Sequence, residues 1–376
     1  MALTIRQGRP GEWQEILGVS HAAFDRPDTY FPDGWPHTYP GPHAAGWFVV
    51  CEEAGRIIGL INQTPVTMDV GGALLKAAGI GGVCVLKEAR GRGIMSAMLT
   101  ASNHQQKEAG TALGFLDGDR TRYRRHGYEI AGHALNARVP AKYLGDVDPV
   151  PLRRLRLADA RAILRCHTRA SMTVRRTEEW QTLLLRRRQY AAWGNRTGPL
   201  KAYLVASKAA SDRIVEIVGD RRLLPGLLKG YLRRHTLDGA SVALVPGYSP
   251  HVELAGKAAG TSAGVPLQIN IFDFGRFLRE TAKPLGDGFR RFGITRRVRV
   301  RHTGEHVSFD LELRRPGALS IAPAKGSRKP DLALDAAEWV RTFFPPPGGP
   351  MVRGRHDERL LAALRLPLAF SSWDSV

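Results

Sequence analysis

Short apolar runs alternate with helix-like periods along the first 145 residues. Trp13, Ile16 and Phe24 recur at helical spacing, which predicts a helix over 11–24. A second helix is expected from about Ile94 to Ala109, where Gly110 ends it. Strands are expected at 3–6, 47–52, 56–67, 112–116 and 128–137, with further strand structure within 74–86. This alternation predicts an α/β (α+β) fold.

The same alternation begins again after Pro149-Val150-Pro151, as a degenerate repeat of the first segment. Its expected strands are 152–156, 202–206, 214–218 and 242–245, and its expected helices are 158–171 and 222–234. A third pattern follows Lys283-Pro284, with strands at 297–301, 307–313 and 318–321, a helix over 336–344 capped by Asp335, and a last helix near 357–364. The sequence therefore predicts three domains, at 1–148, 149–283 and 284–376.

Composition narrows the classes of protein that are compatible with this pattern. The formal net charge is +20, but arginines are dispersed in short pairs through folded segments, so a nucleic-acid partner is not favoured. The first residues contain no apolar stretch of signal-peptide length, and no run is long enough to span a membrane. Cys51, Cys84 and Cys166 lack metal-ligand spacing. We expect a cytoplasmic protein without a metal site.

The most informative stretch is Gly82-Val83-Cys84-Val85-Leu86-Lys87-Glu88-Ala89-Arg90-Gly91-Arg92-Gly93-Ile94-Met95, in which an apolar strand enters a loop that opens a helix. Glycines let a ligand approach the backbone, and the first helical turn offers free N–H groups to a pyrophosphate. The arginines add charge-assisted hydrogen bonds to phosphate. An ordinary strand-to-helix connection is the alternative. The Gly-x-Gly-x-x-Gly pattern of dinucleotide sites and the Walker loop are both absent.

Arg90-x-x-Gly93 after an apolar strand resembles the coenzyme A loop of the GCN5-related N-acetyltransferases (GNAT). Tyr123-Arg124-Arg125-His126-Gly127-Tyr128 resembles the Tyr-Gly-Arg-Phe-Gly-Tyr motif of the enhanced intracellular survival (Eis) acetyltransferases. That family joins an active GNAT domain to a degenerate one and to a domain like sterol carrier protein. The resemblance implies tandem GNAT-type domains followed by a sterol-carrier-protein-like domain, acetyl-CoA as the acyl donor, and a homo-oligomer, by resemblance a hexamer.

The resemblance also implies roles for individual residues. The backbone of Val83, Cys84 and Val85 would meet the pantetheine arm and the thioester. The pyrophosphate would be held by Gly91, Arg92, Gly93, Ile94, Met95 and Ser96, and the cofactor would be lined further along by Gly118 and Asp119. Tyr123 would be the general acid, and the C-terminal carboxylate of Val376 the general base. Two positions depart from the pattern: Met95 replaces a Gly or Ala of the wider superfamily, and Val376 replaces a frequent aromatic residue.

The chemistry explains why these groups are needed. An amine that attacks a thioester must lose a proton, its oxyanion must be stabilised, and the leaving thiolate must be protonated. A tyrosine hydroxyl can protonate the sulfur, and a buried carboxylate is a stronger base than one in water. Other interpretations stay open: Tyr123 as a packing residue, the tail as an ordinary terminus, Asp119 as a reserve base or a solvated loop residue, and the aromatic loop 25–47 as acceptor wall or packing.

The sequence thus predicts an N-acetyltransferase that acts on an amine of a small molecule, such as an antibiotic or another natural product. Two alternatives remain. In the first, the last domain carries an apolar ligand and the acetyltransferase fold is vestigial. In the second, the acceptor is a protein or an RNA, for which the positive charge is the only support.

Overall fold

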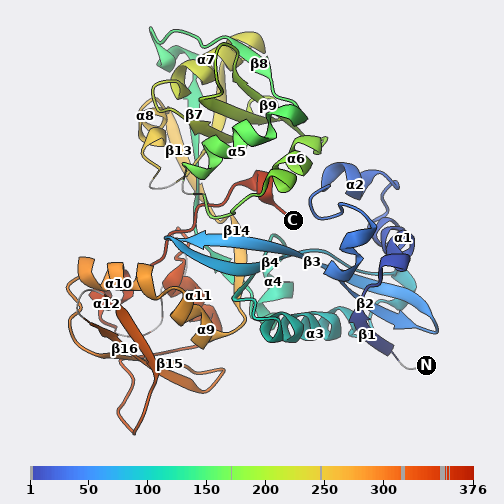
Figure 1. The fold of residues 1–376 in the computed structure, drawn as a ribbon, viewed down its shortest axis with the longest axis vertical. Coiled ribbons are helices and arrows are strands. Elements are labelled where there is room, and N and C mark those ends of the chain that lie inside the picture. Colours follow the sequence, from blue (N-terminus) through green and yellow to red (C-terminus); the bar gives the residue numbers. More distant parts are fainter. Residues whose placement is uncertain are drawn as a thin grey trace.

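The computed structural model describes residues 3–170, 172–245, 248–314, 318–347, 352, 354 and 356–376. The chain forms three β-sheets, each with its own helices, arranged around a central point at which the C-terminus lies (Figure 1). The predicted α/β class is confirmed.

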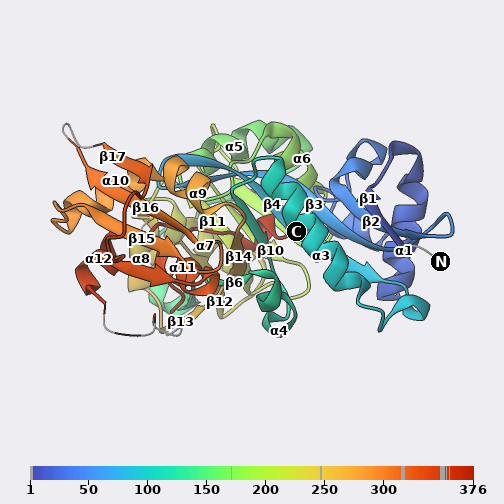
Figure 2. The same ribbon diagram turned by 90° about the horizontal axis from the view of Figure 1, so that it is seen from below.

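The first sheet has seven strands, and most of them come from the first 131 residues. Its order is β1 (Leu3–Gln7), β2 (Phe48–Glu53), β3 (Arg56–Val70), β4 (Ala73–Val85), β5 (Leu113–Leu116), β14 (Leu267–Ile271) and β6 (Glu129–Ala131). The helices of this segment are α1 (Trp13–Phe24), α2 (Tyr30–Gly34), α3 (Ile94–Glu108) and α4 (Arg120–Tyr123). Helix α3 packs across β3 and β4, as the view from below shows (Figure 2).

The second sheet also has seven strands. Its order is β13 (Gly260–Gly264), β7 (Ala134–Pro140), β12 (Gly239–Leu244), β11 (Arg213–Gly219), β10 (Ala202–Ser207), β9 (Tyr190–Asn195) and β8 (Leu152–Arg154). Its helices are α5 (Ala160–Thr168), α6 (Glu178–Arg186), α7 (Leu224–Arg234) and α8 (Pro250–Gly256).

The third sheet has four strands. Two helices precede these strands in the sequence and two follow them. Its order is β17 (Leu319–Pro323), β16 (Val307–Leu313), β15 (Val298–His302) and β18 (Leu332–Leu334). Its helices are α9 (Phe274–Glu280), α10 (Ala282–Arg291), α11 (Ala336–Phe343) and α12 (Glu358–Ala363). As expected, Asp335 caps α11 by accepting a hydrogen bond from the Glu338 N–H.

Two features of the strands were not predicted from the sequence. The single strand expected over 128–137 is two strands, β6 and β7, in different sheets, because the chain turns at Gly132 with φ +66°. Strand β14 comes from the late part of the chain and lies between β5 and β6 in the first sheet. The division at residues 148 and 283 stays a prediction, and these strands connect the segments on either side of it.

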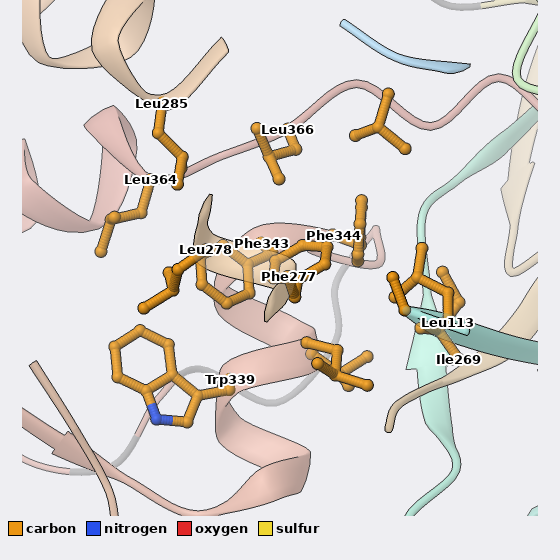
Figure 3. Packing of buried hydrophobic residues seen from close by; sticks show 14 of the residues in the cluster. Leu113, Ile269, Phe277, Leu278, Leu285, Trp339, Phe343, Phe344, Leu364 and Leu366 are labelled. Atoms are coloured by element: carbon orange, nitrogen blue, oxygen red, sulfur yellow. The ribbon is translucent and has the colours of Figure 1, made fainter. Parts of the chain in front are cut away.

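The first and third sheets share one hydrophobic core. Leu113 and Ile269 on the first sheet belong to the same buried cluster as Phe277, Trp339 and Phe343 of the third unit (Figure 3). The third unit is therefore packed onto the first through apolar side chains. No helix within the described ranges is long and apolar enough to cross a membrane.

Candidate active site

The site begins where strands β4 and β5 separate. They pair in parallel from Ala77 to Gly79 only, and β4 then continues to Val85 against β3 on its other side. The β4 edge that faces away from β3 is thus left without a neighbouring strand from Ile80 onward. Such an edge presents N–H and C=O groups that an extended chain with amides can pair with.

A β-bulge redirects β4 within this opening. Leu60 on β3 lies opposite Cys84 and Asn62 opposite Gly81, so two β4 residues, Gly82 and Val83, lie opposite one β3 residue. Gly82 has φ +57°, and a Cβ at this position would collide with the hydroxyl of Tyr39. The bulge turns the end of the strand towards the start of α3, which is a common use of bulges beside functional sites.

A cavity of about 490 Å³ lies between the end of β4 and the start of α3. Eight of the residues predicted to contact the cofactor line it: Val83, Cys84, Val85, Gly91, Gly93, Ile94, Met95 and Ser96. Gly118, Asp119 and Arg92 are not on its wall. The segments on either side of the predicted loop therefore meet at one cavity.

The loop before α3 suits a phosphate group. Gly91 and Gly93 have φ +80° and +75°, and a Cβ at either would meet nothing within 4 Å, so the space above both is open. Helix α3 is 15 residues long, and no side chain of the described residues caps its N-terminus. Its first N–H groups and the positive end of its dipole are therefore free for an anion.

The arginines of the loop make contacts within the chain, and their hydrogen bonds to phosphate stay a prediction. Arg90 donates to the carbonyls of Val85 (3.1 Å) and Ala23 (2.9 Å), which fastens the loop to β4 and α1. Arg92 turns away and forms an ion pair with Glu53 at 2.7 Å. The cationic side chains on the cavity wall are Arg90, Arg122 and Arg125. Arg122 immediately precedes Tyr123 and Arg125 lies two residues after it, and neither was predicted from the sequence as a cofactor contact.

Tyr123 lies at the end of α4, half-buried beside the cavity-lining arginines. Its ring packs edge-on to Tyr128 with centroids 6.3 Å apart, and a Cβ on Gly118 would lie 2.7 Å from that ring, which requires glycine there. Burial raises the pKa of Tyr123, with a smaller lowering by Arg122. The hydroxyl therefore stays protonated at neutral pH, as a proton donor must.

Asp119 caps α4 and is a poor base. Its carboxylate accepts hydrogen bonds from the Thr121 hydroxyl (2.7 Å) and the Thr121 N–H (2.9 Å). These bonds lower the pKa of Asp119. The geometry favours a capping role over the reserve-base role that the sequence left open.

Val376 is half-buried against the face of β4 that Gly79 and Gly81 form. A Cβ on Gly81 would be 2.9 Å from the main-chain carboxyl carbon of Val376, and a Cβ on Gly79 would be 2.6 Å from its Cγ1. Figure 1 shows the C-terminus between α2, α6 and the β3–β4 pair. Only glycines on β4 allow this approach. The tail thus returns to the first sheet where β4 and β5 separate.

The thiol of Cys84 is buried, and burial raises its pKa to about 12. It therefore remains a neutral thiol at physiological pH and is not activated as a nucleophile. Among the described residues no group of three or more His, Cys, Asp or Glu side chains is arranged to hold a metal ion.

The second sheet contains a counterpart of this opening that is closed by its own side chains. Strands β11 and β12 pair in parallel at Arg213 and Ile214 only. Beyond this point the Tyr248 hydroxyl hydrogen-bonds to the N–H and C=O of Gly219 (3.3 and 3.0 Å), and His251 Nε2 donates to the Ile217 carbonyl (2.7 Å). The edge groups of β11 are thereby satisfied within the chain.

A comparison with protein families identifies the kind of domain that contains the site. Residues 4–131 match the family described as acetyltransferase (GNAT) domain. Residues 4–131 form a GNAT domain. The protein is accordingly an N-acetyltransferase, and acetyl-CoA is its acyl donor. The cavity, the glycines and the uncapped helix are the parts of this GNAT domain that fit the donor's phosphates.

Solved structures share the fold of the whole chain. A GCN5-related N-acetyltransferase from Kribbella flavida is 17% identical, with a TM-score of 0.73 over 100% of this chain and 98% of that one. Eis1 from Mycobacterium abscessus is 15% identical, with a TM-score of 0.68 over 100% of both chains. A GCN5-related N-acetyltransferase from Anabaena variabilis is 16% identical, with a TM-score of 0.73 over 98% of both. A comparison with curated proteins gave no match. The fold is therefore Eis-like, with the GNAT domain at its start.

We expect Gly93→Val to weaken acetyl-CoA binding at least about tenfold. A β-branched residue at φ +75° costs about 1–2 kcal/mol, and its side chain would enter the open space above the loop. Calorimetric titration of acetyl-CoA measures the change. Gly198→Val is the control, since Gly198 has φ +67° with nothing within 4 Å but lies in the second sheet's β9–β10 loop. Equal affinity in Gly93→Val and the unmodified protein would contradict the phosphate site.

We also expect one molecule of acetyl-CoA per chain. At the second opening Tyr248 and His251 already hydrogen-bond to the edge groups of Gly219 and Ile217 on β11, whereas β4 has no neighbouring strand on that side from Ile80 onward. The stoichiometry in the same titration tests this. Two equivalents bound, with one lost in a Tyr248→Trp variant, would show that the second sheet also binds the donor.

Proposed function

We propose that the protein transfers an acetyl group directly to an amine of a small molecule, with Tyr123 as general acid and the carboxylate of Val376 as general base. The position of Val376 carries the proposal. Its carboxyl carbon lies against Gly81, next to the bulge whose following residues line the cavity. A base at that point is close to the bond that must be broken.

In this proposal the donor supplies an acyl thioester, and the chain supplies the rest. The backbone of β4 beyond Gly79 offers N–H groups to the pantetheine arm and to the carbonyl oxygen. The carboxylate of Val376 accepts a proton from the amine, directly or through water. Tyr123, kept protonated by its raised pKa, gives a proton to the departing sulfur. Because burial raises the pKa of the Cys84 thiol to about 12, the thiol stays neutral and a covalent acyl-cysteine step is disfavoured.

The acceptor is proposed to be an antibiotic or another natural product with a primary amine. The aromatic loop between α1 and β2 supports a small, partly apolar acceptor, because Trp35 in this loop is half-buried and its ring lies 5.7 Å from the guanidinium of Arg187, which bonds the C-terminal tail. Other parts of the proposal follow the Eis-like fold: a third unit like sterol carrier protein, assembly as a homo-oligomer such as a hexamer, and a cytoplasmic location.

The test is an assay of free thiol released from acetyl-CoA in the presence of diverse primary amines. Small polyamines, aminoglycosides and aryl-alkyl amines form one arm, and lysine-containing peptides and RNA form the other. Turnover only with small amines supports the proposal. Turnover with peptides or RNA at higher kcat/KM, or no turnover with any amine despite donor binding, would overturn the small-molecule assignment.

A further inference from the structure

Four side chains hold the residues immediately before Val376, three of them buried and one, Trp180, half-buried. All of them except His37 belong to the second sheet's unit. They are His37 after α2, and Arg176, Trp180 and Arg187 in and around α6; we call these four the tail clamp. Arg176 precedes α6 and Arg187 follows it, so one short helix presents both cations to the tail. Arg187 is 3% exposed and His37 is fully buried.

Arg187 joins three segments of the chain. Its guanidinium donates to the carbonyl of Trp373 at 2.5 Å and to the carbonyl of Ser375 at 3.4 Å, while its Nε donates to the carbonyl of Gly34 at 3.0 Å. The same guanidinium stacks on Tyr190 at 4.9 Å. Since all five donors of a guanidinium lie in one plane, this contact fixes the direction of the tail as well as its position.

Arg176 and His37 hold the tail from two further sides. Arg176 is bidentate to Asp374, at 2.8 and 2.7 Å, and to Glu216 on β11, at 3.0 and 2.6 Å. His37 Nε2 donates to the carbonyl of Ser375 at 2.9 Å, and Trp180 Nε1 donates to Asp374 at 3.2 Å. The two carboxylates, Asp374 and Glu216, are buried, so loss of Arg176 would leave uncompensated charges. Arg187 bonds main-chain carbonyls instead, so its loss removes tail contacts without unpairing a carboxylate.

The bonds that the clamp makes to the tail fall on Trp373, Asp374 and Ser375, and no ion pair within the described residues involves the carboxylate of Val376. An arginine bound to that carboxylate would stabilise its charge and weaken it as a base. The clamp instead fixes the tail one residue earlier. The clamp therefore fixes the position of the Val376 carboxylate without pairing that carboxylate with a cation.

We propose that Arg187 is the central positioning residue of the enzyme: it fixes residues 373–375 so that the Val376 carboxylate lies on β4, with Arg176, Trp180 and His37 in support. This inference rests on the proposed role of Val376. Under this proposal, the unit that contains the second sheet contributes to the reaction at the first sheet. The edge of its own opening is bonded by Tyr248. The unit holds the base in place without binding the donor.

Two measurements on Arg187→Ala test the proposal. The first follows trimming of the tail by a carboxypeptidase with intact-mass spectrometry, and does not depend on any reaction of the enzyme. Loss of the charge-assisted bonds should raise the trimming rate about 10- to 100-fold. The second is kcat, which should fall towards that of a protein extended beyond Val376, while the calorimetric affinity for acetyl-CoA stays unchanged.

A double-mutant cycle separates a positioning role from a structural one. Arg187→Ala placed in the extended protein should cause no further loss of kcat, because both changes remove the same group from the site. The matched control is Arg188→Ala. Arg188 is the next residue and forms an ion pair with Asp33 at 2.9 Å, yet its side chain is 72% exposed and it does not contact the tail. Trimming and kcat should both stay near those of the unmodified protein.

The outcomes distinguish the possible failures. Unchanged trimming in Arg187→Ala would overturn the clamp. Faster trimming with an unchanged kcat would leave the clamp in place and remove Val376 from the mechanism. A fully additive loss in the double variant would assign Arg187 an effect outside the tail. If Arg187→Ala does not fold, His37→Phe removes the donor to Ser375 but keeps a ring against Trp180, and His37→Gln restores a donor. Equal trimming in these two variants would also overturn the proposal.

Discussion

Appending Gly-Ser-Gly after Val376 is expected to lower kcat by about 10²–10⁴, the usual contribution of a general base. The addition converts the carboxylate of Val376 into a neutral amide and carries the terminal charge away from β4. The carboxyl carbon lies 2.9 Å from the ideal Cβ position of Gly81, so the space for added residues at this point is small. The release of free thiol from acetyl-CoA in the presence of an acceptor amine measures kcat.

Val376→Ala is the matched control, because it keeps the carboxylate and removes only the methyl groups that face Gly79. Its kcat should fall less than tenfold. The affinity for acetyl-CoA should be the same in all three proteins, since the cavity is lined by other residues. An extended protein with the full rate would refute the role of Val376, and Asp119→Asn would then be the variant to measure.

The second large effect is expected for Tyr123→Phe, which should lower kcat/KM by about 10²–10⁴ with little change in acetyl-CoA affinity. Burial raises the pKa of Tyr123, so the hydroxyl remains the protonated, active form through neutral pH. Activity of the unmodified protein should decline at alkaline pH, as that hydroxyl loses its proton. The variant should lack this decline. A pH–rate profile of both proteins measures the difference.

Tyr128→Phe is the control for Tyr123. Tyr128 packs against the Tyr123 ring and donates to Asn103 Oδ1 at 3.2 Å, but it is fully buried, whereas Tyr123 is half-buried. We expect a modest loss of stability, with a kcat/KM close to that of the unmodified protein. An unchanged pH–rate profile in Tyr123→Phe, with full turnover, would exclude Tyr123 as the acid.

Hydrophobic periodicity predicted α3 well and missed α6 and β14. Helix α3 runs from Ile94 to Glu108 almost as expected, because Gly110 gives a clear stop with φ +72°. Helix α6 was missed because it has only nine residues and is followed by a run of arginines. Strand β14 was missed because five buried residues carry no alternation, and its partners are set by packing against β5 rather than by its neighbours in sequence.

The candidate site shows the same limit. The loop from Gly91 to Ser96 was recognised because positive φ and a helix start demand particular residues in a short stretch. The tail clamp could not be found in this way, since Arg176 and Arg187 look like two of many dispersed arginines. Their burial and their bonds to Asp374 and Ser375 depend on contacts about 190 residues apart in sequence. Such contacts have no local pattern.

The place of β14 has a consequence for the order in which the molecule is made. The first sheet lacks its sixth strand until residues 267–271 have been synthesised, although its other strands end at Ala131. Until then β5 and β6 have unpaired edges, which are liable to pair with other chains. During translation the first sheet therefore stays incomplete while more than a hundred further residues are synthesised. During this interval the nascent chain is expected to be most prone to aggregation and to benefit most from a chaperone that covers strand edges.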